Sequence, residues 1–173
     1  MSSDASPYFD SYRSSHAARP PDLARQVYPD EVLDVSANED VLNVIVPPQD
    51  NVRVGRPLGD YVDHQKYLWL VTPGRVLIAL EYGLSGLDLQ RQRLSHTNLS
   101  GGEDAHAGGE LWFYDNHSVM VNGGSSRYEP RSVEELQALA DSFVSARYRV
   151  CCAEWNSDLD RPERVFRGKE PWL

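Results

Sequence analysis

Hydrophobic positions along the middle of the chain predict two β-hairpins. Residues 67–72 (YLWLVT) and 75–81 (RVLIALE) are apolar runs separated by Pro73-Gly74, a pair that favours a tight turn. Residues 110–114 (ELWFY) and 118–122 (SVMVN) repeat this arrangement around a short polar bend. We therefore expect two pairs of antiparallel strands.

After the second hairpin the apolar spacing changes to that of a helix. Ser132 and Glu135 have the spacing of a capping box, in which each side chain bonds to the backbone amide of the other residue. A strand-like run follows at residues 148–155, so the helix is expected to pack on a sheet to which the chain returns. The apolar face of the predicted helix consists of Val133, Leu136, Leu139, Ala140, Phe143 and Val144.

The patterns in the first half of the chain are weaker. Residues 1–20 are rich in small and polar residues, which predicts a flexible or loosely docked arm, although Tyr8, Phe9 and Tyr12 give it aromatic surface. Pro20-Pro21 opens a short helical stretch that ends before Pro29.

Two further strands are expected on either side of the first hairpin. Residues 41–46 (VLNVIV) predict a short strand that two prolines end. Alternating leucines over residues 84–94 predict a weaker strand leading into His96. Residues 21–173 are thus expected to form one α+β domain. It would contain a bent or split, mainly antiparallel sheet, a short N-terminal helix and one long helix in the C-terminal half.

Composition narrows the classes of partner. The chain carries 17 basic and 26 acidic residues, a formal charge of −9, without a basic patch, so no nucleic-acid partner is expected and a basic protein partner suits the acidic surface. No apolar run approaches the roughly 18 to 20 residues that span a bilayer, so no membrane association is expected. The five histidines lack the spacing of a metal motif, and no metal site is expected.

The compartment is inferred from the cysteines and from the N-terminus. Cys151 and Cys152 are adjacent in an expected strand, where their side chains point to opposite faces, so they are interpreted as free thiols in a reducing compartment. The first residues have neither a basic nor an apolar leader region. We expect a cytoplasmic protein, or one delivered into a target cytoplasm without a classical signal peptide.

Residues that could carry chemistry gather between positions 94 and 130. His96 could donate a hydrogen bond to a ribose hydroxyl or act as an acid or base, or it could simply bond to backbone inside the sheet. Thr97 and Asn98 follow it, and Gly101-Gly102 could let backbone approach a ligand or serve only a tight turn.

Further candidates lie downstream of this group. Ser126 and Arg127 could hold a phosphate or carboxylate, although an exposed arginine often binds nothing. Tyr128 could stack on a planar ring or pack as a hydrophobic staple against the following helix. Glu154 lies on the last expected strand, where it could face a site or solvent.

These segments resemble a module of bacterial polymorphic toxins and effectors and of plant IQ-motif calmodulin-binding proteins. The similarity covers roughly residues 94–155 and rests on HTNLSGG, AGGEL and NGGSSRYEP. Ser126 stands where the module has glycine before Arg-Tyr, and Gly108-Gly109-Glu110 stands for its Ala-Gly-Glu element. The chain has no IQ motif, which removes any argument for calmodulin.

A more distant resemblance is to ADP-ribosyltransferases of the diphtheria-toxin and poly(ADP-ribose) polymerase type. It implies NAD as cofactor, with His96 on the nicotinamide ribose, Tyr128 stacked on nicotinamide and Glu154 orienting the ribose. The neighbouring Thr97, Asn98, Gly101, Gly102, Ser126 and Arg127 would then line the cofactor site. Thr97 departs from the family, which has glycine after the histidine.

Three readings of function follow. The first is a toxin- or effector-like domain with NAD-dependent ADP-ribosyltransferase activity. The second is a non-catalytic acidic module, such as an immunity or adaptor protein, that binds a basic partner. The third and weakest is a hydrolase that uses His96 with Asp104 or Glu110, without a nucleophile motif to support it.

Overall fold

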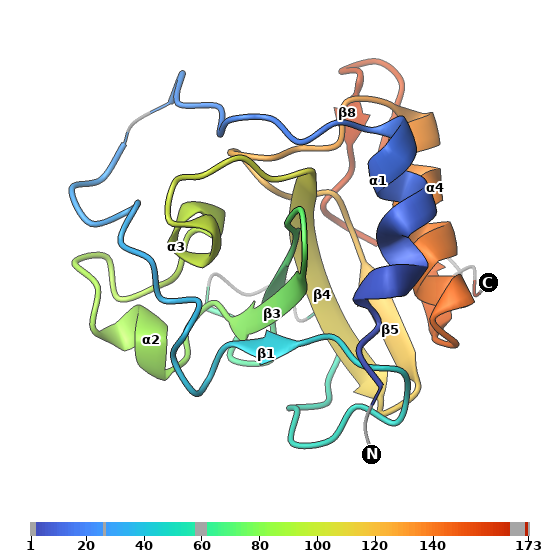
Figure 1. Ribbon diagram of the computed structural model, residues 1–173, viewed down its shortest axis with the longest axis horizontal. Coiled ribbons are helices and arrows are strands. Elements are labelled where there is room, and N and C mark those ends of the chain that lie inside the picture. Colours follow the sequence, from blue (N-terminus) through green and yellow to red (C-terminus); the bar gives the residue numbers. More distant parts are fainter. Residues whose placement is uncertain (1–2, 26, 58–61, 167–171, 173) are drawn as a thin grey trace.

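A six-stranded sheet forms the centre of an α+β fold in the computed structural model, which describes residues 3–25, 27–57, 62–166 and 172 (Figure 1). The strands lie in the order β1-β3-β2-β4-β5-β6, and β7-β8 form a separate small sheet. The expected α+β class with a split, mainly antiparallel sheet is therefore confirmed. The large sheet consists of β1 (Leu42–Asn43), β2 (Tyr67–Val71), β3 (Val76–Leu80), β4 (Ala107–Asp115), β5 (Ser118–Val121) and β6 (Arg149–Cys152).

Both predicted hairpins are present. Strand β2 pairs antiparallel with β3, and β4 pairs antiparallel with β5 through a register shift between Phe113 and Asp115. Strand β2 also pairs with β4, so that Leu68 lies opposite Glu110 and Leu70 opposite Gly108. Because side chains alternate across a strand, these four positions share one face of the sheet.

The predicted helix is α4 (Val133–Ser145), and its crossover makes β6 run parallel to β5. Ser132 Oγ accepts a hydrogen bond from the Glu135 amide at 3.0 Å, as expected. The Glu135 carboxylate does not complete the box, because it contacts Arg131 instead.

Helices cover both faces of the sheet (Figure 1). The face that carries Trp69 packs against α4, the 3-10 helix η1 (Ser6–Phe9) and α1 (Asp10–Ser15). The opposite face, which carries Leu68 and Leu70, packs against α3 (His96–Ser100), Val35 and Val41, and Leu89 and Leu94, which follow the short helix α2 (Leu84–Leu87). Two apolar layers thus enclose the sheet. The small sheet consists of β7 (Trp155–Asn156) and β8 (Arg161–Pro162).

The N-terminal segment differs from the expected flexible arm. Phe9 and Tyr12 are buried, and the Phe9 ring meets Phe143 of α4 edge-on with 5.0 Å between the ring centroids. Arg13 donates from Nε to the Thr72 carbonyl oxygen at 2.9 Å, which ties α1 to the first hairpin. The aromatic surface of this segment outweighs its polar composition, and the segment belongs to the core.

The short N-terminal helix also lies elsewhere than expected. It is α1, whereas residues 21–25 and 27–29 contain no helix. Strand β1 covers only part of the expected run 41–46, with one further bridge between Asp4 and Ile45. Asp4 thereby extends the sheet from the N-terminal segment.

The expected strand over residues 84–94 is wrong. Helix α2 and turns occupy this stretch, with Leu84 and Leu87 exposed and Leu89 and Leu94 buried. Gly86 explains why the chain can turn here, because a Cβ atom would lie 2.6 Å from the Glu81 carbonyl oxygen. The alternating leucines belong to an irregular segment of a short helix and turns, which buries only some of their side chains.

Two other sequence-based expectations concern the cysteines and membranes. Cys151 and Cys152 form no disulfide, and Cys151 is buried in the sheet. Within the part of the chain that the structure describes, no helix is long and apolar enough to cross a bilayer.

Candidate functional site

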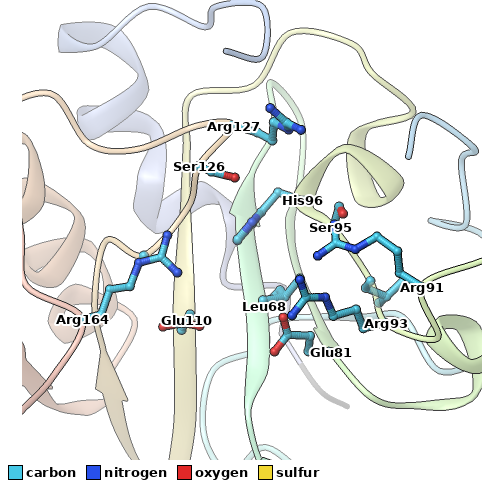
Figure 2. A pocket seen from close by; sticks show the side chains of 12 residues that line it. Leu68, Glu81, Arg91, Arg93, Ser95, His96, Glu110, Ser126, Arg127 and Arg164 are labelled. Carbon is cyan, nitrogen blue, oxygen red and sulfur yellow. The ribbon is translucent and has the colours of Figure 1, made fainter. Parts of the chain in front are cut away.

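A cleft of about 150 Å³ opens where α3 approaches the start of β4 (Figure 2). Its walls come from the loop before α3, from strands β2 and β4, and from residues 124–127 and 164. Figure 2 shows His96 between Arg164 on one side and Arg91 and Arg93 on the other. We call it the central cleft. The polar side chains that matter below are Glu81, Arg91, Arg93, His96, Glu110, Arg127 and Arg164.

His96 is the first residue of α3. The sequence had suggested instead that it lies at the end of a strand. A capping box fixes this start, because the Ser95 amide donates to Asn98 Oδ1 at 2.9 Å. The imidazole lies close against β4, because a Cβ atom at Gly108 would stand 2.7 Å from His96 Cδ2. The glycine at position 108 is therefore required for the histidine to reach the strand.

The protonation of His96 follows from this position. Its Nε2 lies 2.9 Å from the carbonyl oxygen of Gly109, and because a carbonyl only accepts, Nε2 carries the proton. Burial lowers the pKa of His96 to about 4, against the smaller opposing effects of the Gly109 hydrogen bond and of Glu110. At neutral pH the ring is uncharged, and Nδ1 is left as a hydrogen-bond acceptor.

Glu110 places a carboxylate in the same cleft. Lys66 Nζ lies 2.8 Å from Glu110 Oε2 and 2.9 Å from Glu81 Oε2, so one ammonium joins two carboxylates. Burial alone would lower the pKa of Lys66, but the attraction of Glu110 and Glu81 raises it above its ordinary value. Lys66 is therefore charged at all physiological pH values.

Asn122 fixes the other side of Glu110. Its Nδ2 donates to Glu110 Oε1 at 3.0 Å, and its Oδ1 accepts from the backbone amides of Glu110 and Gly124. The Asn122 side chain thus satisfies the Glu110 amide at the end of the β4–β5 pair, while the Asn122 amide still donates to the Glu110 carbonyl oxygen. The carboxylate is held from both sides before any ligand arrives.

Four arginines surround these groups, and three are already in contact with other side chains. Arg91 lies over the Tyr28 ring with 3.9 Å between its Cζ and the centroid, and Arg93 Nη1 is 3.5 Å from Tyr82 Oη. Arg164 lines the cleft from an exposed position. Arg127 is held by an ion pair at 2.6 Å with Glu31.

The structure does not bring His96, Tyr128 and Glu154 together as one site. Tyr128 is fully buried, its hydroxyl donates to the Glu103 carbonyl oxygen at 2.7 Å, and it also contacts Ser100 Oγ. Its ring has no face open to a ligand. Glu154 is exposed and lines a separate hollow between α4 and β6, beside Leu136 and Cys152.

Most of the other expected cofactor residues stabilise the fold. Thr97 Oγ1 donates to Glu31 Oε2 at 3.1 Å, and Asn98 Nδ2 donates to the carbonyl oxygens of Asp30 and Leu33. Together they anchor residues 30–35 onto α3.

Of the remaining expected cofactor residues, Gly101 and Gly102 form a turn of the fold, whereas Ser126 and Arg127 line the cleft. Gly101 and Gly102 end α3 at φ values of 65° and 79°, a left-handed conformation that glycine adopts most easily. The tight turn, one of the two roles predicted for Gly101 and Gly102, therefore accounts for both glycines. Ser126 is half-buried and lines the cleft, so Ser126 and Arg127 remain candidates together with His96.

Sequence reasoning missed most of the charged groups at the site. Glu110 was considered only beside His96 in the hydrolase reading, and Asp104, its alternative there, is exposed in the loop after α3. Lys66, Glu81 and Asn122 carry no local signal, because strand pairing alone brings them to Glu110. The glycine pair before Glu110 was the one available sign that another group lies close to β4.

No metal cluster is apparent at the cleft or elsewhere among the described residues: nowhere do three His, Cys, Asp or Glu side chains group in a way that could hold an ion. No protein-family model, curated protein or solved structure matches the chain.

Proposed function

We propose that the central cleft binds a small phosphate-bearing ligand, and that this ligand is NAD. The observation that carries the proposal is the gathering of arginines around a cleft that also contains His96 and a fixed carboxylate. The arginine side chain is long, and its planar guanidinium can donate two parallel hydrogen bonds to the oxygens of a phosphate.

The local charge supports an anionic ligand. The chain as a whole has a formal charge of −9. In contrast, the side chains that line the cleft, together with the side chains that form ion pairs with them, include more cations than carboxylates. A cleft of positive charge in an acidic protein draws anions toward it. The five cations are Lys66, Arg91, Arg93, Arg127 and Arg164, and the three carboxylates are Glu31, Glu81 and Glu110.

Within this proposal Glu110 takes the role that the resemblance gave to Glu154. When the bond between the ribose C1′ and the nicotinamide nitrogen breaks, its electron pair leaves with nicotinamide and positive charge develops on the ribose. A carboxylate at that position stabilises the charge. An acceptor then forms the new bond to C1′ and loses a proton, which completes an ADP-ribosyl transfer.

His96 has a positioning role in this scheme. Its Nε2 proton is held by Gly109, and its uncharged Nδ1 can accept a hydrogen bond from a ribose hydroxyl. A group with a pKa of about 4 is a weak base near neutral pH, so His96 is expected to orient the sugar rather than to remove a proton.

Titration calorimetry with NAD, together with an assay for nicotinamide release, tests the proposal. Glu110→Gln should retain NAD binding and lose release by about 100-fold or more, a typical effect of removing an electrostatic catalytic group. Glu154→Gln, the matched control in the other hollow, should behave as the wild type. Equal losses in both variants, or normal release in Glu110→Gln, would refute the assignment of Glu110.

Binding is tested separately from chemistry. Arg164→Ala removes an exposed charge beside the cleft and should weaken NAD binding about tenfold, the effect of roughly 1.4 kcal/mol. Arg147→Ala removes an exposed charge in the turn after α4 and should leave the affinity unchanged. No NAD binding by the wild type would instead favour a non-catalytic acidic module that binds a basic protein.

A further inference from the structure

A wider hollow of about 750 Å³ adjoins the central cleft, and the two share Arg91 and Arg93 as a common wall. Tyr28, His64 and Tyr82 line this second hollow, which we call the side bay. The central cleft of about 150 Å³ is much smaller than the several hundred Å³ of typical small-molecule sites, whereas the side bay is of that size. A ligand held in the cleft can therefore extend into the bay past the two arginines.

The side chains of the side bay present planar groups to one another. The guanidinium of Arg91 covers the Tyr28 ring with 3.9 Å between its Cζ and the ring centroid, and Arg91 is half-buried and lines the bay. The His64 and Tyr82 rings lie with 6.3 Å between their centroids at an interplanar angle of 66°. Tyr28 and Tyr82 are half-buried and His64 is exposed, so this planar surface can be reached from solvent.

We propose that the side bay holds the planar base of a nucleotide whose phosphates lie against Arg91 and Arg93 and whose far end enters the central cleft. This inference rests on the proposed function, since it takes the cleft to be the phosphate-binding site. Aromatic rings and guanidinium planes stack on any nucleobase, while the phosphates would be matched by arginine forks. A simple phosphate or a sugar phosphate would leave the aromatic surface of the bay unused.

Comparing ADP with inorganic pyrophosphate by titration calorimetry measures the contribution of the adenosine, and the variants of the aromatic side chains show how much of it comes from the stacked base. The wild type should bind ADP at least tenfold more tightly than pyrophosphate, consistent with a stacked base that contributes about one factor of ten or more. Tyr82→Leu should remove most of this preference; because it also removes the contact of Tyr82 Oη with Arg93, its effect is expressed as the ratio of the ADP and pyrophosphate affinities of the same variant. His64→Ala, at an exposed position where folding is not at risk, should reduce the preference in the same direction.

Tyr114→Leu is the matched control. Tyr114 is 38% exposed and, like Tyr28, has an arginine over its ring, but it lies on β4 with Arg56 rather than in the side bay. This variant should keep the full preference for ADP.

The outcomes separate the two proposals. Equal affinities of the wild type for ADP and pyrophosphate would overturn the side bay as a base site and leave the phosphate site in the central cleft standing. A preference for ADP that survives in both Tyr82→Leu and His64→Ala would overturn it as well. Failure of ADP, pyrophosphate and NAD to bind at all would overturn both proposals.

Discussion

Arg127 and Glu31 form a buried ion pair in which the arginine Nε lies 2.6 Å from Glu31 Oε2 and Nη2 donates to Oε1 at 2.8 Å. The two side chains are 6% and 1% exposed. Glu31 also accepts from Thr97 of α3, so the pair joins three segments that the chain order keeps apart: residues 28–31, the start of α3 and the loop after β5. The wall of the central cleft depends on this junction.

Glu31→Gln should therefore lower the free energy of unfolding by about 3–5 kcal/mol, because it leaves the guanidinium of Arg127 buried without its counter-charge. Urea unfolding measures the loss. The double variant Glu31→Gln/Arg127→Gln should regain part of it, since no unpaired charge remains. Asp10→Asn removes a carboxylate that is 73% exposed in its pair with Arg13 and should cost about 1 kcal/mol or less.

Gly108→Ala tests whether the absence of a side chain at position 108 lets the His96 ring lie against β4. The added methyl would meet His96 Cδ2 at 2.7 Å and the Trp69 carbonyl oxygen at 3.1 Å, and such overpacking costs about 1–3 kcal/mol. We expect a lower melting temperature and a shifted His96 ring signal in the NMR spectrum. Gly74→Ala is the control, because no atom lies within 4 Å of the added carbon; an equal effect there would argue against the His96 contact.

The low pKa of His96 predicts a defined acid sensitivity. An unfolded histidine titrates near pH 6.5, whereas burial lowers the native pKa to about 4. Between these values the unfolded chain takes up a proton that the native chain does not, so the free energy of unfolding falls as the pH drops through this window. The full loss is about 3 kcal/mol, and above pH 6.5 this contribution is constant.

His96→Gln lacks the titrating ring but retains a donor for the Gly109 carbonyl oxygen. Its stability should depend less on pH than that of the wild type between pH 6.5 and 4, as followed by urea unfolding at several pH values. Parallel profiles for the two proteins would show that His96 does not titrate in this way.

The burial of Tyr128 predicts that it affects stability and not ligand binding. Tyr128→Phe removes a hydroxyl that donates to the Glu103 carbonyl oxygen, and an unmet buried acceptor costs about 1–3 kcal/mol. NAD affinity measured by calorimetry below the melting temperature should not change. Tyr128→Phe keeps the aromatic ring, so the stacking role that the sequence suggested is tested by Tyr128→Leu: a selective loss of NAD binding in a stably folded Tyr128→Leu would restore that role.

The N-terminal segment is predicted to contribute as much as an ordinary core element. Phe9→Ala should cost about 3–5 kcal/mol, since Phe9 has no exposed surface and packs on Phe143. Its neighbour Tyr8 is 39% exposed, and Tyr8→Ala should cost about 1 kcal/mol or less. Thermal unfolding of the two variants compares them directly.

Local patterns predicted the elements whose partners are close in sequence. The hairpins of β2–β3 and β4–β5 and the start of α4 at Ser132 were read correctly, because turn residues and helix caps act within a few positions. The segments 3–20 and 84–94 were misread for the opposite reason. Phe9 finds its partner in α4, and the leucines of residues 84–94 are sorted by tertiary contacts rather than by strand alternation.

The residues of the candidate site divide in the same way, into those with a local signal in the sequence and those that only the fold brings together. His96 and the glycines before Glu110 could be selected from the sequence because they stand in an unusual local context. The groups around Glu110 lie just before β2, just after β3 and just after β5, and only strand pairing brings them together. The burial of Tyr128 could not be predicted, because a tyrosine two residues before a proline looks the same in the sequence whether its ring faces a ligand or the core.

The packing of η1 and α1 on α4 also bears on how the protein is made. Phe9 and Trp69 are synthesised well before Phe143, whose ring packs against both of them. A nascent chain that ends before Phe143 therefore carries uncovered aromatic rings, the kind of surface that chaperones bind and that aggregates form from. The core around Phe9 and Trp69 can close only after α4 has been synthesised.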